Sequence, residues 1–447
     1  MRDGTSPGEA DPQGSNLPSG ASGPGAAGSS AAGPSAAGSN AGGRRRGGKP
    51  RRKPDAKRSA ILGAMFLMAT SAIGPGFITQ TAVFTVNLGA AFAFAILVSI
   101  LVDIAVQLNV WRIIGISGLR AQVLGNKVLP GIGWVLAVLV FVGGLVFNIG
   151  NVAGTGLGLN AMLGLDPKIG SALSALLAIL IFLSKRAGLA LDRVVVFLGA
   201  LMILLMLYVA IVANPPVGSA LKNTVLPDQV DFLAITTLIG GTVGGYITYA
   251  GAHRMVDAGN SGVENLGSIT RASLLGVIVT GIMRVLLFLA ILGVVAGGAV
   301  LTSGNYAAEA FGVAAGEVGI RLFGIVFWAA ALTSVIGASY TSVSFVTNLT
   351  TRARTRNLLT VAFIAVCTAA YLLLGQTPQT LLVFAGAFNG LILPLGFAVL
   401  LWAAWRRRDL LAGYNYPKWL LIVGVLAWLL TLYLGWNSLA GLGDLWS

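Results

Sequence analysis

Residues 71–81 read SAIGPGFITQT and lie inside an apolar run that is long enough to cross a membrane. Pro75 has no backbone N–H to donate to the preceding turn, and its ring clashes with the carbonyl four residues earlier. The glycines on either side, Gly74 and Gly76, let the chain leave helical geometry easily. This pattern predicts a helix that is broken at membrane depth.

A second weak point lies in residues 240–249, which read GGTVGGYITY within another apolar run. The two breaks fall in the first and the sixth predicted helices, as expected of inverted repeats with a binding site at their interface. Half-helix ends at such a site leave N–H and C=O groups free to hold a solute. Glycine-rich spans also occur simply because they allow close helix packing, and this alternative stays open.

The composition indicates a membrane protein, because 56% of the 447 residues are hydrophobic and only 10% are charged. Apolar runs of about 20 residues recur along it, each long enough to span the hydrocarbon core as a helix. They lack the alternation of a membrane β-barrel. We therefore predict an all-α polytopic membrane protein with spans at 60–86, 90–112, 130–162, 170–184, 191–213, 231–255, 268–298, 319–349, 357–374, 379–405 and 416–436.

The predicted organisation is two inverted repeats, at 59–213 (helices one to five) and 214–405 (helices six to ten), followed by a basic loop and an eleventh helix at 406–447. Residues 1–58 are rich in Gly, Ala, Ser and Pro and then basic, which predicts a disordered cytoplasmic tail.

Much of the net charge of +14 comes from the basic run at 44–58 and from alternate loops. Since no aromatic residue interleaves that run, we expect no nucleic-acid partner. The loop asymmetry predicts a multi-pass protein of the inner (plasma) membrane, with its N-terminus in the cytoplasm and its C-terminus outside. The expected partners are the lipid bilayer and a small solute or ion, and the sequence sets no oligomeric state.

Two charged residues, Asp103 and Arg284, lie deep within predicted helices two and seven. An unpaired charge at that depth costs several kcal/mol, so we expect the two to form an ion pair or to line one cavity. A purely structural pair is an equal alternative. The only histidine, His253, is expected at the membrane interface.

Nearly everything after Lys57 resembles the Nramp family of proton-coupled divalent metal transporters. The likeness rests on Pro75-Gly76, FNIGNVAGT at 147–155, GGTV at 240–243 with Tyr249, Thr333-Ser334, Ser339-Tyr340, Leu393-Pro394 and RRDL at 407–410. The resemblance implies a LeuT-type fold with two inverted five-helix repeats plus an eleventh helix. It also implies a secondary-active symporter of divalent metal ions such as manganese.

The family's metal positions read differently in this chain. Its Asp-Pro-Gly-Asn pattern is Gly74-Pro75-Gly76-Phe77 here, and its Met-Pro-His pattern is Gly244-Gly245-Tyr246. Asn148 and Asn151 stand where the resemblance places an Asp and a Glu, and Gly386 stands where it places a glutamine. The scaffold is therefore expected without the side chains that hold metal and pass protons.

Two kinds of cargo remain open. The resemblance favours a divalent metal, whereas glycines at 74, 244 and 245 would widen the site and bare N–H groups for a carboxylate, as in an amino or organic acid. The substrate-binding candidates are Gly74, Pro75, Gly76, Phe77, Gln80, Gly244, Gly245 and Tyr246. Thr341 and Ser342 are candidates for the coupling ion, although such hydroxyls often bond their own helix, and Asn148 and Asn151 are expected to line the cavity.

An intramembrane enzyme is the weaker alternative class. The sequence has no His-Glu-x-x-His pattern, no paired carboxylates and no histidine at membrane depth. We expect neither a catalytic residue nor a cofactor.

Overall fold

The computed structural model describes residues 73–257, 259–302, 304–348 and 350–444, without the side chains of 185–196, 442 and 444. The predicted tail at 1–58 and the start of the first predicted span lie outside these residues. Every regular element of the described chain is helical, which confirms the all-α prediction. The elements are α2 (Pro75–Leu88), η1 (Gly89–Ala91), α3 (Phe92–Ser117), α4 (Ala121–Val128), α5 (Ile132–Leu163), α6 (Pro167–Leu183), α7 (Lys185–Val212), α8 (Val217–Val225), α9 (Phe232–Thr242), α10 (Ile247–Asp257), η2 (Val263–Asn265), α11 (Leu266–Ala296), α12 (Tyr306–Val346), α13 (Ala353–Leu374), α14 (Pro378–Arg406), η3 (Arg408–Leu411) and α15 (Lys418–Asp444).

Local chemistry explains several helix starts. Asp166 caps α6 by accepting hydrogen bonds from the N–H groups of Lys168 and Ile169, and a proline follows it at the first helical position. Asp231 caps α9 in the same way through the N–H of Ala234. Thr377 and the proline after it begin α14. These caps satisfy N–H groups that a helix leaves without partners.

Each of the eleven predicted spans overlaps a helix of the described chain. Eight of those helical segments are both long and apolar enough to cross a membrane, and a ninth is possible if the pair 197–212 and 217–225, bent by 109°, forms one span. The helix at 167–183 is apolar but shorter. The chain is thus a multi-pass membrane protein, while the count of eleven crossings and the repeat boundaries stay predictions.

Two short helices, α4 and α8, are not predicted from the sequence, because their apolar faces are too short to stand out from the loops around them. The first part of α12 is not predicted either. Gly316, with φ +65° and ψ −160°, breaks the helical geometry there, so the predicted span at 319–349 is the second part of that element.

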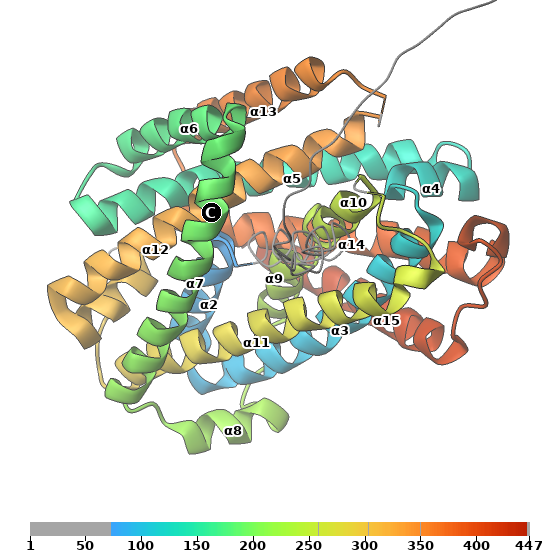
Figure 1. Cartoon of the computed structure of the whole chain (residues 1–447). Coiled ribbons are helices and arrows are strands. Elements are labelled where there is room, and N and C mark those ends of the chain that lie inside the picture. The colour runs from blue at the N-terminus through green and yellow to red at the C-terminus, as the bar shows by residue number, and fades with distance from the viewer. Residues whose placement is uncertain (1–72, 258, 303, 349, 445–447) are drawn as a thin grey trace, which may run out of the picture. The chain divides into compact units, whose positions relative to one another are not determined.

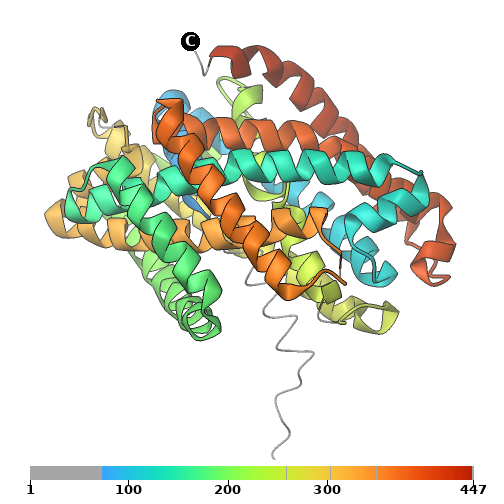
Figure 2. The same cartoon turned by 90° about the horizontal axis from the view of Figure 1, so that it is seen from above.

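The broken segment formed by α9 and α10 lies in the middle of the bundle (Figure 1). α9 packs against α14, α15 and α3, and α10 packs against α3 and α12. α2 also lies inside, against α11, α12, α14, α9 and α5. The view from above shows α13 crossing α5 (Figure 2). Both predicted breaks are therefore surrounded by other helices.

Candidate functional site

The helix that carries the first predicted break begins at Pro75. Gly74 precedes it in an extended conformation (φ −92°, ψ −174°) and supplies no side-chain cap. A proline suits the first position of a helix because the N–H it lacks would have no helical partner. Gly154 of α5 has no side chain here, and a Cβ would overlap the Pro75 ring. Helical geometry thus starts within the predicted break, while the segment before residue 73 lies outside the described chain.

The second predicted break is present. α9 ends at Thr242 and α10 begins at Ile247, with residues 243–246 between them outside regular helix. Gly245 has φ +51°, a left-handed conformation that L side chains rarely adopt. The prediction of a broken sixth helix is confirmed.

The expectation that Gly244 and Gly245 widen the site is wrong. A Cβ at Gly245 would overlap the Asn389 side-chain oxygen, and one at Gly244 would lie 2.8 Å from the Asn389 carbonyl. α14 occupies the space that the missing side chains leave. These glycines therefore serve close packing against Asn389, which is the alternative that the sequence left open.

Gln80 of α2 packs its side-chain amide against α9 and α14. Its Nε2 donates to the carbonyl of Leu382 at 2.8 Å, and its Oε1 has no partner. A Cβ at Gly241 or at Gly386 would overlap the Gln80 amide. Gly386 is the position where the resemblance places a glutamine, so an amide reaches that place from α2 instead of from α14.

Tyr246 and the two asparagines of α5 form a polar cluster beside the break. The rings of Tyr246 and Phe147 meet edge to face at 5.5 Å. The Tyr246 hydroxyl lies near Asn151 but completes no hydrogen bond. Asn148 donates to the Ser339 hydroxyl at 3.0 Å, and Asn151 donates to the Asn148 side-chain oxygen at 3.4 Å. Tyr246, Asn148 and Asn151 are thus brought together, as predicted for a shared site.

The two coupling-ion candidates differ in their surroundings. The Thr341 hydroxyl donates to the Gly337 carbonyl of its own helix at 2.9 Å, which is the common role of a hydroxyl in a helix. The Ser342 hydroxyl has no partner and abuts Gly144 of α5. The Ser342 hydroxyl is thus entirely without a partner, whereas the Thr341 hydroxyl offers a ligand only its lone pairs.

Asp103 and Arg284 come close to each other without forming an ion pair. Asp103 accepts a hydrogen bond from Thr242 at 2.7 Å, at the end of α9. The Arg284 guanidinium lies 4.5 Å from the centre of the Phe77 ring, and its Nη1 is 3.5 Å from the Ser99 hydroxyl. The ion pairs within 4.0 Å in the described chain do not include these two residues. The direct ion pair is thus a wrong prediction, because Asp103 bonds Thr242 and Arg284 stacks on Phe77. The alternative, that the two side chains line one cavity, stays a prediction, and their charges still act on each other electrostatically.

The region is closed to solvent in this conformation. Phe77, Gln80, Tyr246, Asp103 and Arg284 each expose 2% of their surface or less. Several of their polar atoms nevertheless have no partner within the described chain: Gln80 Oε1, Asp103 Oδ1, Asn151 Oδ1, Tyr246 Oη, Arg284 Nε and Nη2, Ser342 Oγ and Asn389 Oδ1. Buried polar atoms without partners are rare in proteins and point to a site that a ligand completes.

Residues 65–441 match the model of the Nramp family, which is described as natural resistance-associated macrophage protein-like. The chain belongs to the Nramp family. It is therefore a secondary transporter and not an enzyme.

Two curated proteins are close relatives of this Nramp chain. It is 49% identical over 391 residues to the uncharacterized membrane protein YcsG of Bacillus subtilis (strain 168), covering 87% of this chain and 96% of the relative. It is 51% identical over 369 residues to an uncharacterized membrane protein of Haemophilus influenzae, covering 82% and 92%.

Solved structures support the LeuT-type fold. A manganese transporter of Eremococcus coleocola aligns with a TM-score of 0.68 at 16% identity, covering 87% of this chain and 88% of that one. MhsT in complex with L-phenylalanine aligns with a TM-score of 0.63 at 18% identity, covering 84% and 98%. The fold implied by the resemblance is thus confirmed, while the assignment of this chain's residues to the family's metal positions stays a prediction.

The Nramp chain shows no cluster for a metal ion in the part that the structure describes, where no three His, Cys, Asp or Glu side chains come together. His253 is buried within the protein, and its expected place at the membrane interface stays a prediction. Its Nε2 accepts the N–H of Ala121 at 3.1 Å, at the start of α4, and its Nδ1 lies 3.1 Å from the Ser344 hydroxyl. Since Ala121 donates to Nε2, the neutral ring carries its proton on Nδ1. This histidine holds helices together.

Sequence reasoning missed two polar residues at the break. Asn389 of α14 is fully buried and donates to the carbonyls of Gly143 at 3.0 Å and Ala385 at 2.8 Å. Thr242 holds Asp103. Asn389 could have been found as the one amide in the apolar run 381–401, whereas Thr242 gave no signal, because threonines are common in these helices.

Proposed function

We propose that this Nramp-family transporter works by alternating access and carries a small carboxylate-bearing organic solute, an amino or organic acid, together with a driving cation. The observation that carries the proposal is the buried Arg284, whose Nε and Nη2 lack hydrogen-bond partners. A guanidinium presents its N–H groups as a fork that matches a carboxylate. A fixed positive charge at the same place opposes a divalent cation.

The position of Arg284 supports the same cargo. Its guanidinium lies over Phe77, which belongs to the first turn of α2. N–H groups in a first turn have no helical partners, and the helix dipole favours negative charge there. Two features that attract an anion therefore meet at Phe77.

The buried acceptors without partners match the amino group of an amino-acid cargo. Gln80 Oε1 and Asn151 Oδ1 are buried without donors, and the Tyr246 hydroxyl can accept or donate. An amino group or a hydroxyl of the cargo would complete them. For the driving cation we propose the Ser342 hydroxyl as one oxygen ligand.

We further propose that the protein lies in the cell membrane with its N-terminus in the cytoplasm and its C-terminus outside. The support is the cation content of alternate loops, which follows the positive-inside rule.

A divalent metal ion is the second candidate cargo. Family membership favours it, and so does the likeness to a manganese transporter. Asp103 Oδ1 is an unpartnered buried carboxylate oxygen that could serve as one ligand. Against it stands the lack, in the described chain, of any group of three His, Cys, Asp or Glu side chains, because an ion such as Mn²⁺ needs several ligands.

Uptake by purified protein in liposomes separates the two cargoes. The panel contains small amino acids, small organic acids and Mn²⁺, under imposed Na⁺ and proton gradients. We expect saturable uptake of a carboxylate that Arg284→Gln abolishes. The matched control is Arg321→Gln, which removes an arginine whose side chain is 53% exposed and paired with Glu317. Saturable Mn²⁺ uptake, with no carboxylate transported, would establish the second candidate.

A further inference from the structure

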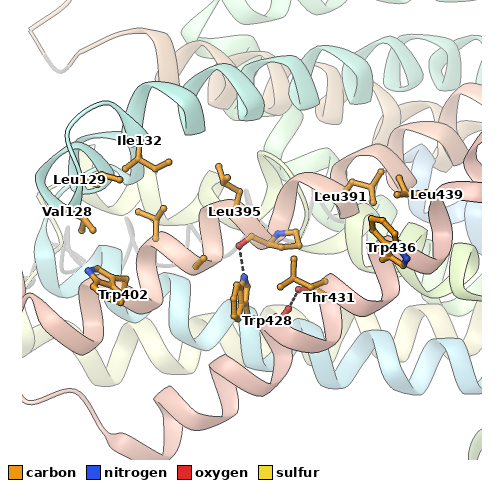
Figure 3. Close-up of a pocket in the computed structure, with 15 residues that line it drawn as sticks. Val128, Leu129, Ile132, Leu391, Leu395, Trp402, Trp428, Thr431, Trp436 and Leu439 are labelled. Carbon is orange, nitrogen blue, oxygen red and sulfur yellow. Dashed lines mark hydrogen bonds between the residues drawn. The ribbon is translucent and has the colours of Figure 1, made fainter.

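A long apolar groove runs along the outside of the bundle, away from the break. A cavity of about 940 Å³ lies between α14, α15 and the start of α5. Its walls include Ile132, Leu395, Trp402, Trp428 and Trp436 (Figure 3). A second cavity of about 300 Å³ shares Ala398, Trp402 and Trp428 with it and extends the groove to Trp405. We call this continuous depression the α14–α15 groove.

Two polar side chains of the walls already have hydrogen-bond partners. The Trp428 indole donates to the Pro394 carbonyl at 3.0 Å, and the Thr431 hydroxyl donates to the Trp428 carbonyl at 2.8 Å. Both bonds are drawn in Figure 3. A ligand in this groove thus finds a mainly apolar surface, with the hydrogen bonds of Trp428 and Thr431 already made.

The groove opens onto the lipid-facing side of the spanning helices. Its rim includes Trp402, 49% exposed, Trp405, 53% exposed, and Trp436, 77% exposed. α14 and α15 are both long and apolar enough to span a membrane, so we expect hydrocarbon around this rim. From Leu391 to Trp405 α14 rises about 21 Å at 1.5 Å per residue, which exceeds half of a ~30 Å hydrocarbon core. An acyl chain of one leaflet therefore fits along it.

One end of the groove is cationic. Arg406 stacks on the Trp405 ring at 4.1 Å and is exposed. Lys127 is exposed and directly precedes Val128 and Leu129, which line the groove. Arg408, two residues after Arg406, begins η3 and is also exposed.

The neighbouring arginine is already compensated. Arg407 pairs with Asp409 at 2.8 Å and donates to the Lys127 carbonyl at 2.6 Å. The Arg407 guanidinium holds the pKa of Asp409 below its usual value. Three cations, Lys127, Arg406 and Arg408, thus remain uncompensated by this pair.

We propose that the α14–α15 groove binds one anionic phospholipid. The acyl chain lies along α14 between Trp402 and Trp436, and the phosphate lies between Lys127 and Arg406. The apolar walls select a lipid, and the cations select an anionic headgroup over a zwitterionic one. Pro394, a residue of the groove, lies five positions after Asn389, which packs against the break. A bound lipid therefore contacts the helix that closes the site.

The test is lipid retention by the purified full chain in detergent, measured by native mass spectrometry with phosphatidylglycerol and phosphatidylcholine in turn. We expect one retained phosphatidylglycerol, and roughly tenfold weaker retention in the Lys127→Gln, Arg406→Gln double variant. The matched control is Arg352→Gln with Arg354→Gln, which removes two exposed cations at the start of α13. That control is expected to retain the lipid as the wild type does.

A second probe locates the acyl chain. Phosphatidylglycerol with brominated acyl chains is expected to quench tryptophan fluorescence less in Leu395→Trp, which fills the groove, after correction for the added indole. Equal retention of the two lipids, or equal loss in the control, would overturn the proposal and leave only unspecific annular lipid. A dimer that shields these tryptophans from the brominated lipid would also overturn it, in favour of a second copy of the chain.

Discussion

Two buried polar regions of this protein differ in how completely their hydrogen bonds are made. Where α4, α10 and α12 meet, Arg120 pairs with Asp257 at 2.7 Å and donates to the carbonyls of Ser344 and Thr347. Tyr340 adds a hydrogen bond to Asp257 at 3.2 Å. Around the start of α2 and the α9–α10 break, Gln80, Asp103 and Arg284 instead keep polar atoms without partners.

This difference distinguishes a region that stabilises the fold from a region that is proposed to bind a solute. A buried charge whose partners are all present fixes the helices that supply them. Buried donors and acceptors without partners cost free energy unless something else completes them. The first region therefore locks the ends of three helices, and the second region is where we propose that a solute makes up the missing bonds.

The largest expected effect is on stability, in the saturated region. Asp257→Ala leaves the Arg120 charge, 3% exposed, without its carboxylate and should cost about 3–5 kcal/mol. Thermal unfolding in detergent measures the loss. The control is Asp228→Ala, which breaks an exposed pair with Lys222 and should leave the unfolding temperature unchanged. Equal effects of the two substitutions would remove the distinction between the regions.

A smaller loss of stability is expected where α14 meets the break. Gly245→Ala forces a side chain into a left-handed conformation and against Asn389, which should cost about 2 kcal/mol and reduce transport. Gly218→Ala is the matched control, because nothing lies within 4 Å of a Cβ there. If both variants unfold and transport like the wild type, the packing of Asn389 on the break contributes neither to stability nor to transport.

In the unsaturated region stability and function should separate. Arg284→Gln removes the unpartnered Nε and Nη2 groups together with the stacking on Phe77 and the contact with Ser99, so the free energy of unfolding should change by less than about 2 kcal/mol. Transport of the carboxylate should nevertheless fall at least tenfold. Unfolding temperature and initial uptake rate are measured on the same preparation. A large destabilisation with unchanged uptake per folded molecule would make Arg284 a structural residue.

The smallest effect is expected at the exposed Arg407–Asp409 pair. Arg407 lowers the pKa of Asp409, so the pair adds stability above the carboxyl's usual pKa of 3.8, and this contribution is lost as pH falls through the lowered value. Asp409→Asn should lower the unfolding temperature slightly at pH 7 and not at all in strong acid. A difference that persists in acid would show that Asp409 acts by something other than its charge.

The sequence predicted features that depend on a few neighbouring residues. The Gly-Pro-Gly at 74–76 predicted where α2 begins, and the Gly-Gly at 244–245 predicted where α9 ends. Both could be predicted because backbone freedom and a missing N–H act locally. The features that it missed depend on tertiary packing. No local pattern says that Asn389 fills the space beside Gly245, or that Gln80 reaches Gly386 from another helix. The roles of Thr341 and Ser342 likewise depend on which neighbour each hydroxyl meets.

The most direct measurement is equilibrium binding of the transported carboxylate to purified wild-type protein, Arg284→Lys and Arg284→Gln. We expect one molecule bound per wild-type chain, weaker binding to Arg284→Lys, which keeps the charge but loses the fork, and no binding to Arg284→Gln. The same affinity in all three proteins would contradict a site built on Arg284 at the broken helices.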